Sequence, residues 1–304
     1  MSQRLVGHAE LFPIRTVSHL TGVNPVTLRA WERRYGLVKP VRTPGGQRAY
    51  TRADINEIQR ILAQLERGAS IGQVRPERRV PESTQRAAGP WHAYRERMTA
   101  AIGQFDEDLL EDTYNEVLSL YPSDLVTANV LQPLLAALGE RWRNATGSVA
   151  EEHFFSVYLR NKLGARFHHR ARRDSGARLL AACLPGEHHE AGLLLFALAA
   201  HERGFRLVLL GADMPLAELV PAVQRSRAAA VVLSGAIEPQ PGLYERDLPA
   251  LVRAAGVPIF VGGPRAAADH DAISTAGATP LGLHIDSGLK RISETLAERR
   301  APRR

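Results

Sequence analysis

Leu184-Pro-Gly-Glu-His-His-Glu-Ala-Gly192 is the stretch that decides the fold, because strand-like and helix-like sequence meet in it. An apolar run at residues 178–184 leads into it, and a helical pattern rich in leucine and alanine follows Gly192. This order predicts that His189 lies in the loop at the carboxyl end of a parallel strand, where open α/β sheets bind their ligands. A neutral imidazole there can bind a metal through one ring nitrogen while a carboxylate holds the other. The alternative is a loop histidine that only caps the next helix.

The last third of the chain, residues 174–304, repeats this alternation of strand and helix. Strand-like runs lie at residues 178–184, 206–210, 229–234 and 257–261, helical patterns at 190–203, 215–226, 243–254 and 265–275, and an apolar patch at 280–284 precedes a helix at about 286–299. Alternating units of this length predict a doubly wound parallel α/β domain of the Rossmann-like kind. The loops after its strands contain Glu187, His189 and Gly192, then Ser234-Gly-Ala236, then Gly262 and Gly263.

The middle segment, residues 91–173, is expected to form a four-helix bundle. Its amphipathic patterns cover residues 91–103, 106–120, 123–143 and 149–171, with Asp106 and Ser123 as expected helix caps. Trp142, Glu152 and His153 stand out between the third and fourth helices, in the spacing W-x9-E-H. Taken alone, Trp142 is interpreted as a core or rim aromatic residue and Glu152 as a carboxylate of a first helical turn.

The first segment, residues 1–75, has the pattern of a winged helix-turn-helix. A short helix ends at Gly22, Asn24 and Pro25 are suited to begin a second helix that ends at Gly36, and this second helix is short and basic. A Gly-Gly hairpin at residues 38–50 is expected to form the wing. A further helix is predicted at residues 54–65, and a last short helix is predicted to begin at Gly68.

Three motifs of this first segment resemble the winged helix-turn-helix of the MerR regulator family: Ile14-Arg-Thr-Val-Ser18, Thr27-Leu-Arg-Ala-Trp-Glu-Arg-Arg-Tyr-Gly36 and Gly46-Gln-Arg-Ala-Tyr50. The resemblance covers residues 12–75. It implies contacts with DNA phosphates, which give affinity more than sequence selection, by Arg29, Arg33, Arg42, Arg48 and Tyr50. Arg34 and Thr27 are expected to contact bases. The alternative is a basic, solvated face on a helical domain that does not bind DNA.

Residues 76–90 are charged and bounded by proline, which indicates a linker that lets the DNA-binding head move. The long dimerisation helix and the cysteine loop found in many MerR proteins have no counterpart in the sequence. A metal effector bound by thiolates is therefore not expected.

Length, charge and hydropathy agree with a regulator of this kind. The 304 residues are enough for two or three domains, and the 44% hydrophobic content argues against general disorder. The formal net charge of +7 comes mainly from arginine, which favours nucleic acid but also occurs as a compositional bias. The single cysteine, Cys183, excludes a disulfide framework. Without a signal peptide or an apolar run of about 20 residues, the protein is expected to be cytoplasmic, with no membrane partner.

Residues 176–299 resemble the cobalamin-binding module of methionine synthase, the mutases and the corrinoid proteins. The family pattern D/E-x-H-x-x-G, then S-x-L or S-x-T, then G-G appears here as Glu187-x-His189-x-x-Gly192, Ser234-Gly-Ala236 and Gly262-Gly263. The resemblance implies that His189 is the lower axial ligand of cobalt and that Glu187 polarises it. Ser234 and the glycines would let the nucleotide tail of the cofactor approach the backbone. Ala236 departs from the pattern, and a degenerate module that no longer binds cobalamin is the alternative.

Head, bundle and cobalamin module in this order resemble the MerR-family cobalamin-dependent photoreceptor repressors, the CarH/LitR class. The resemblance implies that Trp142 covers the 5′-deoxyadenosyl group on the upper face of the corrin, with Glu152 and His153 nearby. In that class a histidine follows the tryptophan directly, whereas this chain has Arg143. Arginine has no lone pair to donate to cobalt at neutral pH. His153 or water is therefore left as the upper ligand after loss of the adenosyl group.

The sequence thus predicts a transcriptional repressor, not an enzyme, that binds operator DNA and adenosylcobalamin and has no catalytic residues. By resemblance it would be a homotetramer in the dark, would dissociate in light, and would control genes of carotenoid synthesis. Three alternatives remain open: a light-insensitive cobalamin sensor, motivated by Arg143; a corrinoid methyltransferase or mutase subunit; and a DNA-binding scaffold with an empty cobalamin fold.

Overall fold

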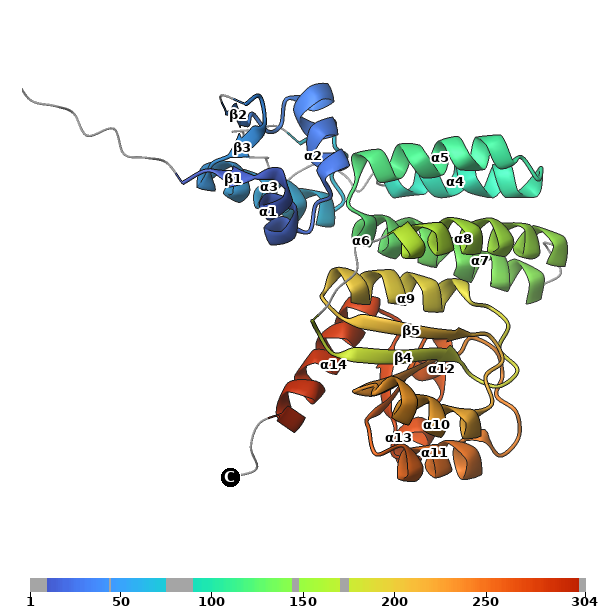
Figure 1. The fold of residues 1–304 in the computed structure, drawn as a ribbon. Coiled ribbons are helices and arrows are strands. Elements are labelled where there is room, and N and C mark those ends of the chain that lie inside the picture. The colour runs from blue at the N-terminus through green and yellow to red at the C-terminus, as the bar shows by residue number, and fades with distance from the viewer. Residues whose placement is uncertain (1–9, 44, 75–89, 144–147, 170–174, 301–304) are drawn as a thin grey trace, which may run out of the picture. The chain divides into compact units, whose positions relative to one another are not determined.

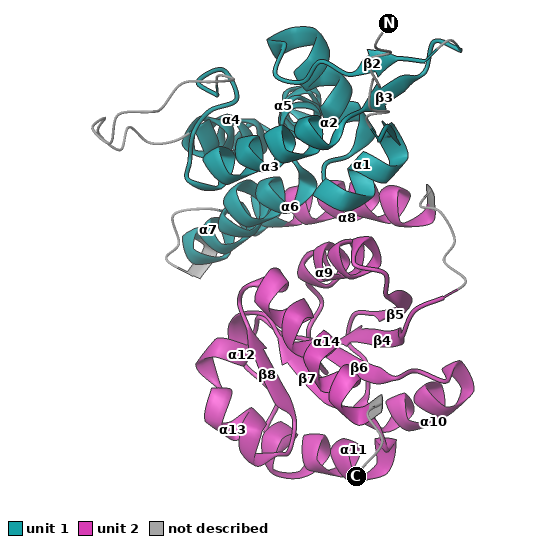
Figure 2. Ribbon diagram, turned by 90° about the vertical axis from the view of Figure 1, so that its left-hand side faces the viewer, with its two compact units in different colours: residues 1–152 teal, residues 153–304 magenta. Residues whose placement is uncertain are grey.

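The computed structural model describes residues 10–43, 45–74, 90–143, 148–169 and 175–300, and the side chains of residues 142, 143, 169 and 300 are also outside the description. The chain divides into two compact units, Met1–Glu152 and His153–Arg304, called unit 1 and unit 2 below (Figure 2). The expected linker at 76–90 lies almost wholly outside the described residues. Among the described helices, none is both long enough and apolar enough to cross a membrane.

Unit 1 begins with the expected winged helix-turn-helix. Its elements are β1 (Phe12–Pro13), α1 (Ile14–Thr21), α2 (Pro25–Ala30), a π-helical turn (Trp31–Tyr35), β2 (Val41–Arg42), β3 (Arg48–Tyr50) and α3 (Arg52–Glu66) (Figure 1). Asn24 caps α2 as predicted, since its side chain accepts a hydrogen bond from the Thr27 N–H at 2.8 Å. The strands form a small antiparallel sheet in the order β1-β3-β2, of which β1 was not predicted.

Two local predictions for unit 1 are wrong. The described residues after Gly68 form turns up to Val74, and no helix begins there. Gly68 has a positive φ of 90°, which ends the preceding helix, and a single new turn is costly to nucleate. Ser123 is the first residue of its helix and not its cap, because Pro122 occupies the cap position.

The expected helices of the middle segment are present. They are α4 (Pro90–Gly103), α5 (Glu107–Leu120), α6 (Ser123–Val126), a π-helical turn (Thr127–Leu131), α7 (Gln132–Arg143) and α8 (Val149–His169). Asp106 caps α5 as predicted, by accepting a hydrogen bond from the Leu109 N–H at 2.9 Å. The predicted helix at 123–143 runs through α6 and α7, with the π-helical turn between them. The division between the two units falls within the first turn of α8.

Unit 2 contains the predicted parallel sheet. Its strands are β4 (Arg178–Cys183), β5 (Arg206–Gly211), β6 (Ala230–Ser234), β7 (Ile259–Gly262) and β8 (Thr279–Gly282), all parallel, in the order β5-β4-β6-β7-β8. The helices are α9 (Ala191–Glu202), α10 (Leu216–Ser226), a π-helical turn (Leu243–Asp247) followed by α11 (Leu248–Ala255), α12 (Pro264–Ala268), α13 (His270–Thr275) and α14 (Ile285–Arg300).

Two layers of helices cover this sheet. On one face Leu179, Val232 and Phe260 pack with side chains of α9 and α14. On the other face Leu180, Val231 and Leu233 pack with side chains of α10, α11 and α13. Successive residues of β4 and β6 are therefore buried on opposite faces, which explains why these strands are apolar throughout.

The strand order fixes where a ligand can bind. The chain leaves β4 toward β5 on one side and later returns to β6 on the other side of β4, so the topological switch point lies between the carboxyl ends of β4 and β6. Cys183 pairs with Ser234, and Ser234 pairs with Gly262, so the three strands end in register. The loops that carry the three predicted motifs consequently start side by side.

Candidate functional site

The loop after β4 is built around a carboxylate and an imidazole. The Leu184 N–H donates to the Ser234 carbonyl at 2.9 Å, and the Glu187 N–H closes a turn on the Leu184 carbonyl at 3.0 Å. Gly186 permits this turn with a φ of +81°. The turn buries the Glu187 side chain, which is 1% exposed, whereas the side chain of His189 is 45% exposed.

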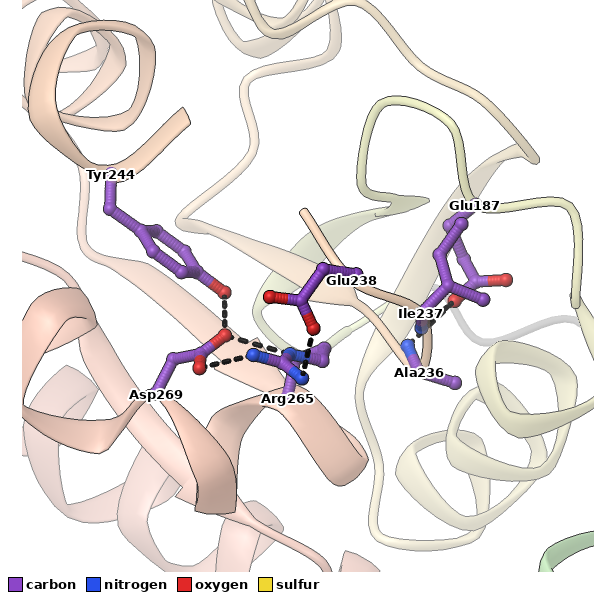
Figure 3. Close-up of polar contacts among 7 residues, drawn as sticks. All are labelled: Glu187, Ala236, Ile237, Glu238, Tyr244, Arg265 and Asp269. Carbon is purple, nitrogen blue, oxygen red and sulfur yellow. Dashed lines mark hydrogen bonds and ion pairs between the residues drawn. The ribbon is translucent and has the colours of Figure 1, made fainter. Parts of the chain in front are cut away.

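Glu187 uses one carboxylate oxygen for each of two loops. Its Oε1 lies 2.5 Å from His189 Nδ1 and accepts the His189 backbone N–H at 2.9 Å. Its Oε2 accepts the backbone N–H groups of Ala236 at 2.6 Å and Ile237 at 3.0 Å, in the loop after β6 (Figure 3). Burial alone would raise the pKa of Glu187, but the hydrogen bonds from His189 and Ala236 outweigh it and hold this pKa below its ordinary value.

This arrangement suits a histidine that binds a metal. Because Glu187 holds His189 Nδ1, a metal would be bound through Nε2, and a carboxylate partner increases the basicity of such a ligand. The described residues include no group of three or more His, Cys, Asp or Glu side chains that could hold a metal ion by themselves. A single protein ligand is enough for a metal whose other coordination positions are filled mainly by a macrocycle, as in cobalamin.

Cys183 is not a second ligand of this kind. Its thiol is buried, and burial raises its pKa to about 12, so it stays protonated at neutral pH. Its sulfur lies 3.9 Å from the His189 carbonyl oxygen, where it packs beneath the loop.

The serine and glycines of the motifs lie at the same edge of the sheet. A Cβ added to Gly192 would lie 3.8 Å from Ser234 Oγ, so the loop after β4 and the end of β6 are close together. Gly263 has a φ of +92°, and a Cβ there would lie 2.7 Å from the Gly235 carbonyl oxygen, so only glycine fits. A Cβ at Gly262 would make ordinary contact, 3.9 Å from Leu281. The backbone can therefore be approached closely at this edge of the sheet, as a cofactor tail would require. Contacts of these residues with the cofactor stay a prediction.

Ala236, which departs from the family pattern, contributes to the site through its backbone N–H. Its N–H holds Glu187, and this contact is independent of the side chain. The departure therefore leaves the carboxylate–histidine pair intact.

The predicted upper-face residues are only partly described. Trp142 and Arg143 end α7, but their side chains lie outside the described residues. Glu152, in the first turn of α8, is half-buried, and His153 after it is exposed. Arg141 and Glu151 form an ion pair at 3.1 Å, which joins the end of α7 to the beginning of α8. The ion pair thus links the neighbour of Trp142 with the neighbour of Glu152.

Four of the predicted DNA-binding arginines are exposed on α2, on the π-helical turn after it and on β2: Arg29, Arg33, Arg34 and Arg42. Arg48 is half-buried, and its Nε donates to a carboxylate oxygen of Glu32. Arg42 also pairs with Glu32, at 3.7 Å. Glu32 therefore fixes the wing arginines relative to the helix. The sequence did not indicate this role, because the partners of Glu32 lie on β2 and β3 and only folding brings them to the helix.

Thr27 and Tyr50, which were expected to contact DNA, have buried side chains. Both side chains are fully buried, so neither reaches a base or a phosphate in this conformation. The Thr27 hydroxyl donates to the Leu118 carbonyl at 3.4 Å. The Tyr50 hydroxyl is buried without a hydrogen-bond partner among the described residues, and burial raises its pKa. Both residues therefore support the fold of the head in this conformation.

The head is docked on the middle segment within unit 1. Trp31 Nε1–H donates to the Leu120 carbonyl at 2.9 Å, and the Ile71 N–H donates to the Tyr121 hydroxyl at 3.3 Å. Tyr121 packs against Trp91, with ring centroids 4.6 Å apart. The inner face of α2 and its π-helical turn is thus bound by the end of α5, while the arginines occupy the outer face.

Two further carboxylates hold the loop that carries His189. Asp213 accepts the Gly186 N–H at 2.7 Å and donates its own N–H to the Glu187 carbonyl at 2.8 Å. Glu190 accepts the Ala212 N–H at 3.1 Å and lies 3.9 Å from Arg160 of α8. In the sequence, the only signal for either was its position after a strand, Glu190 in the stretch 184–192 and Asp213 in residues 211–215.

Comparisons with known proteins agree with this arrangement. The family described as "MerR HTH family regulatory protein" matches residues 12–77, and two families described as "B12 binding domain" match residues 94–166 and 177–282. The HTH-type transcriptional repressor CarH of Myxococcus xanthus is 33% identical over 294 residues, which cover 91% of this chain and 95% of that protein. The repressor CarA of the same organism is 32% identical over 274 residues, 87% of this chain and 91% of that protein.

One solved structure adds to the fold. The monomethylamine corrinoid protein of Methanosarcina barkeri superposes with a TM-score of 0.54 at 17% identity, covering 67% of this chain and 99% of that protein. At this identity the match concerns the fold alone.

The first prediction concerns Glu187→Gln in the cofactor-free protein. Glutamine presents an NH2 group to backbone donors, so the free energy of unfolding at pH 7 should fall by about 1–3 kcal/mol. The pKa of Glu187 in the folded protein lies below its ordinary value. The wild-type carboxylate therefore stabilises the folded protein fully above a pH of about 4.3, and this stabilisation is lost as the pH falls through the folded pKa. The difference between wild type and variant should therefore shrink below pH of about 4.

Urea unfolding from pH 7 to pH 3 measures this difference. Glu298→Gln makes the same chemical change at an exposed position of α14 and serves as the control, with an expected change under about 0.5 kcal/mol. A difference for Glu187→Gln that does not vary with pH would contradict the ionised, hydrogen-bonded carboxylate.

Proposed function

The chain belongs to the family of MerR-type transcriptional regulators with cobalamin-binding domains that includes the repressors CarH and CarA, and we propose that it is a repressor switched by adenosylcobalamin and light. The observation that carries this proposal is the Glu187–His189 pair at the switch point of the parallel sheet, in a chain that begins with a DNA-binding head. It acts as a regulator and not as an enzyme, in the cytoplasm, where its DNA lies.

His189 is the residue proposed to bind cobalt from below. Glu187 keeps Nδ1 engaged and the ring oriented, and the Ala236 and Ile237 N–H groups keep Glu187 in place. Gly192, Ser234, Gly262 and Gly263 are proposed to receive the nucleotide tail at the strand ends. When bound, the cofactor supplies a cobalt–carbon bond that light can break.

Trp142, Glu152 and His153 are proposed to cover the adenosyl side of the site. In support, the Arg141–Glu151 ion pair joins the two helix ends that carry them. A change in what these residues contact would act on the end of α7 and the start of α8, where they lie. A ligand can shift an assembly only by interacting differently with its two states, and these helix ends are where that difference would arise.

The exposed arginines are proposed to bind operator DNA. Several heads in one oligomer, a tetramer by resemblance, would bind together with an avidity that a single head lacks. Dissociation in light would remove that avidity and release the DNA. Genes of carotenoid synthesis are the proposed targets, by the same resemblance.

Arg143 favours a second candidate, a cobalamin-sensing regulator that does not respond to light. An arginine cannot become the upper ligand of cobalt, which leaves His153 or water. A corrinoid carrier of the methyltransferase kind is a third candidate, since the fold also matches a corrinoid protein. The DNA-binding head argues against the third candidate.

The second prediction concerns DNA. Arg33→Ala should weaken binding to a generic duplex and reduce the slope of log Kobs against log salt by about one, because one phosphate contact is lost. Arg253→Ala removes the same charge from an exposed position on α11 in unit 2 and should leave the slope unchanged. Fluorescence anisotropy at several salt concentrations measures both, and equal slopes for the two variants would exclude Arg33 from the interface.

The third prediction concerns the cofactor. Wild-type protein incubated with adenosylcobalamin in the dark should retain it after gel filtration, with the absorption spectrum of cobalt bound to histidine. His189→Ala should lose that spectrum and bind more weakly, because the lower ligand is absent. His270→Ala, an exposed histidine on α13, is the matched control. Wild-type protein that elutes without cofactor would leave only the empty-fold alternative.

The fourth prediction separates the light switch from the light-insensitive sensor. With adenosylcobalamin, gel filtration should show a larger species in the dark than after green light, and hydroxocobalamin should give no light response. Arg143→His supplies a donor next to Trp142, so its illuminated spectrum should gain features of two histidine ligands that wild type lacks. Identical elution of wild type in dark and light would reject the switch and favour the sensor.

A further inference from the structure

A second polar cluster lies beside the site, and the proposed function does not use it. Asp269, between α12 and α13, accepts hydrogen bonds from Arg265 Nε at 2.7 Å and from the Tyr244 hydroxyl at 2.8 Å, and Arg265 Nη2 bonds its other carboxylate oxygen. The side chains of Arg265 and Asp269 are only 17% and 15% exposed. Burial and the Asp269 hydrogen bond raise the pKa of Tyr244, so the phenol stays protonated and donates. We call these three residues the Asp269 cluster.

The cluster closes the loop that follows β6. The segment of residues 235–244 starts where the Gly235 carbonyl accepts the Arg265 N–H at 3.1 Å and ends at Tyr244, in the π-helical turn that follows the loop. It is called the loop below. In between, Glu238 pairs with Arg265 Nη1 at 3.1 Å, and Figure 3 shows this bond beside those of Tyr244 and Asp269. Both ends of the loop, and a point within it, are therefore tied to Arg265 and Asp269.

The same loop contains the donors that hold Glu187. Ala236 and Ile237 lie between Gly235 and Glu238, so the loop bonds Glu187 on one side and the Asp269 cluster on the other (Figure 3). A Cβ on Gly186 would lie 3.1 Å from the Gln240 side chain, so the loop also packs against the turn before Glu187. A shift of this loop would move two of the hydrogen bonds that keep Glu187 against His189.

We propose that the Asp269 cluster is a positioning device for the lower ligand: by fixing residues 235–244, it keeps Glu187 and hence His189 in the geometry that binds cobalt. Tyr244, Arg265 and Asp269 act through the loop and do not themselves contact the metal. This inference rests on the cobalamin binding proposed above.

Tyr244→Phe and Asp269→Asn test the inference, and Arg246→Ala is the control. Tyr244→Phe removes one hydroxyl and leaves the Arg265–Asp269 pair, so it should fold even if Asp269→Asn does not. Arg246 lies two residues from Tyr244 and forms an ion pair with its neighbour Asp247 at 2.8 Å. Arg265→Lys keeps the charge but not the two-point contact with Asp269. We expect it to loosen the loop less than Asp269→Asn does.

The first measurement uses cofactor-free protein. Hydrogen exchange followed by mass spectrometry should be about tenfold faster in peptides covering residues 235–241 of Tyr244→Phe, because one hydrogen bond to a charged group is lost. Peptides from β4 and β7 should exchange as in wild type. Unchanged exchange of the loop, or faster exchange throughout unit 2, would overturn the inference, since the second result indicates a general loss of stability.

The second measurement uses protein reconstituted with adenosylcobalamin in the dark. The fraction with the spectrum of histidine-bound cobalt should fall several-fold in Tyr244→Phe and Asp269→Asn and stay at the wild-type level in Arg246→Ala. A wild-type spectrum in both variants, with a loosened loop, would overturn the link to His189. If wild type itself takes up no cobalamin, the proposed function fails, and with it the link, whereas the exchange experiment still decides whether the cluster holds the loop.

Discussion

A buried carboxylate is the constraint on which the site in unit 2 depends. An ionised side chain that is 1% exposed is stable only if its oxygens are hydrogen-bonded. Glu187 meets this requirement with donors from two loops, His189 on its own loop and the Ala236 and Ile237 N–H groups on the loop after β6. The charge therefore joins two strand ends, and the orientation of the imidazole follows from that joint.

The strand order makes this joint possible. Only at the switch point do two neighbouring parallel strands send their following chain in opposite directions, which leaves space for a ligand between the loops. Here β4 and β6 end in register. The close approach of Gly263 to Gly235 also keeps the loop after β7 near the loop after β6. Asp213 and the Asp269 cluster support the two loops from outside. The histidine is thus held by two successive layers of polar contacts.

In unit 1 a single short helical segment serves two interfaces. Its outer face carries Arg29, Arg33 and Arg34, while Trp31 on its inner face is buried and bonded to the end of α5. Glu32 ties the wing arginines to the same segment. Any movement of α5 would therefore act on the element that carries the arginines proposed to bind DNA.

The sequence by itself determined the parallel sheet, the helix-turn-helix and the position of His189 at a strand end, because these depend on local periodicity, caps and glycine turns. It could not determine the contacts of Glu187 with Ala236 and Ile237, of Thr27 with Leu118, or of Tyr244 with Asp269. These partners are 49, 50, 91 and 25 residues apart in the chain, and only folding brings them together. The burial of Thr27 and Tyr50 was missed for the same reason: a residue type that suits a DNA contact suits a packed core equally well, and the neighbouring elements decide which of the two it joins.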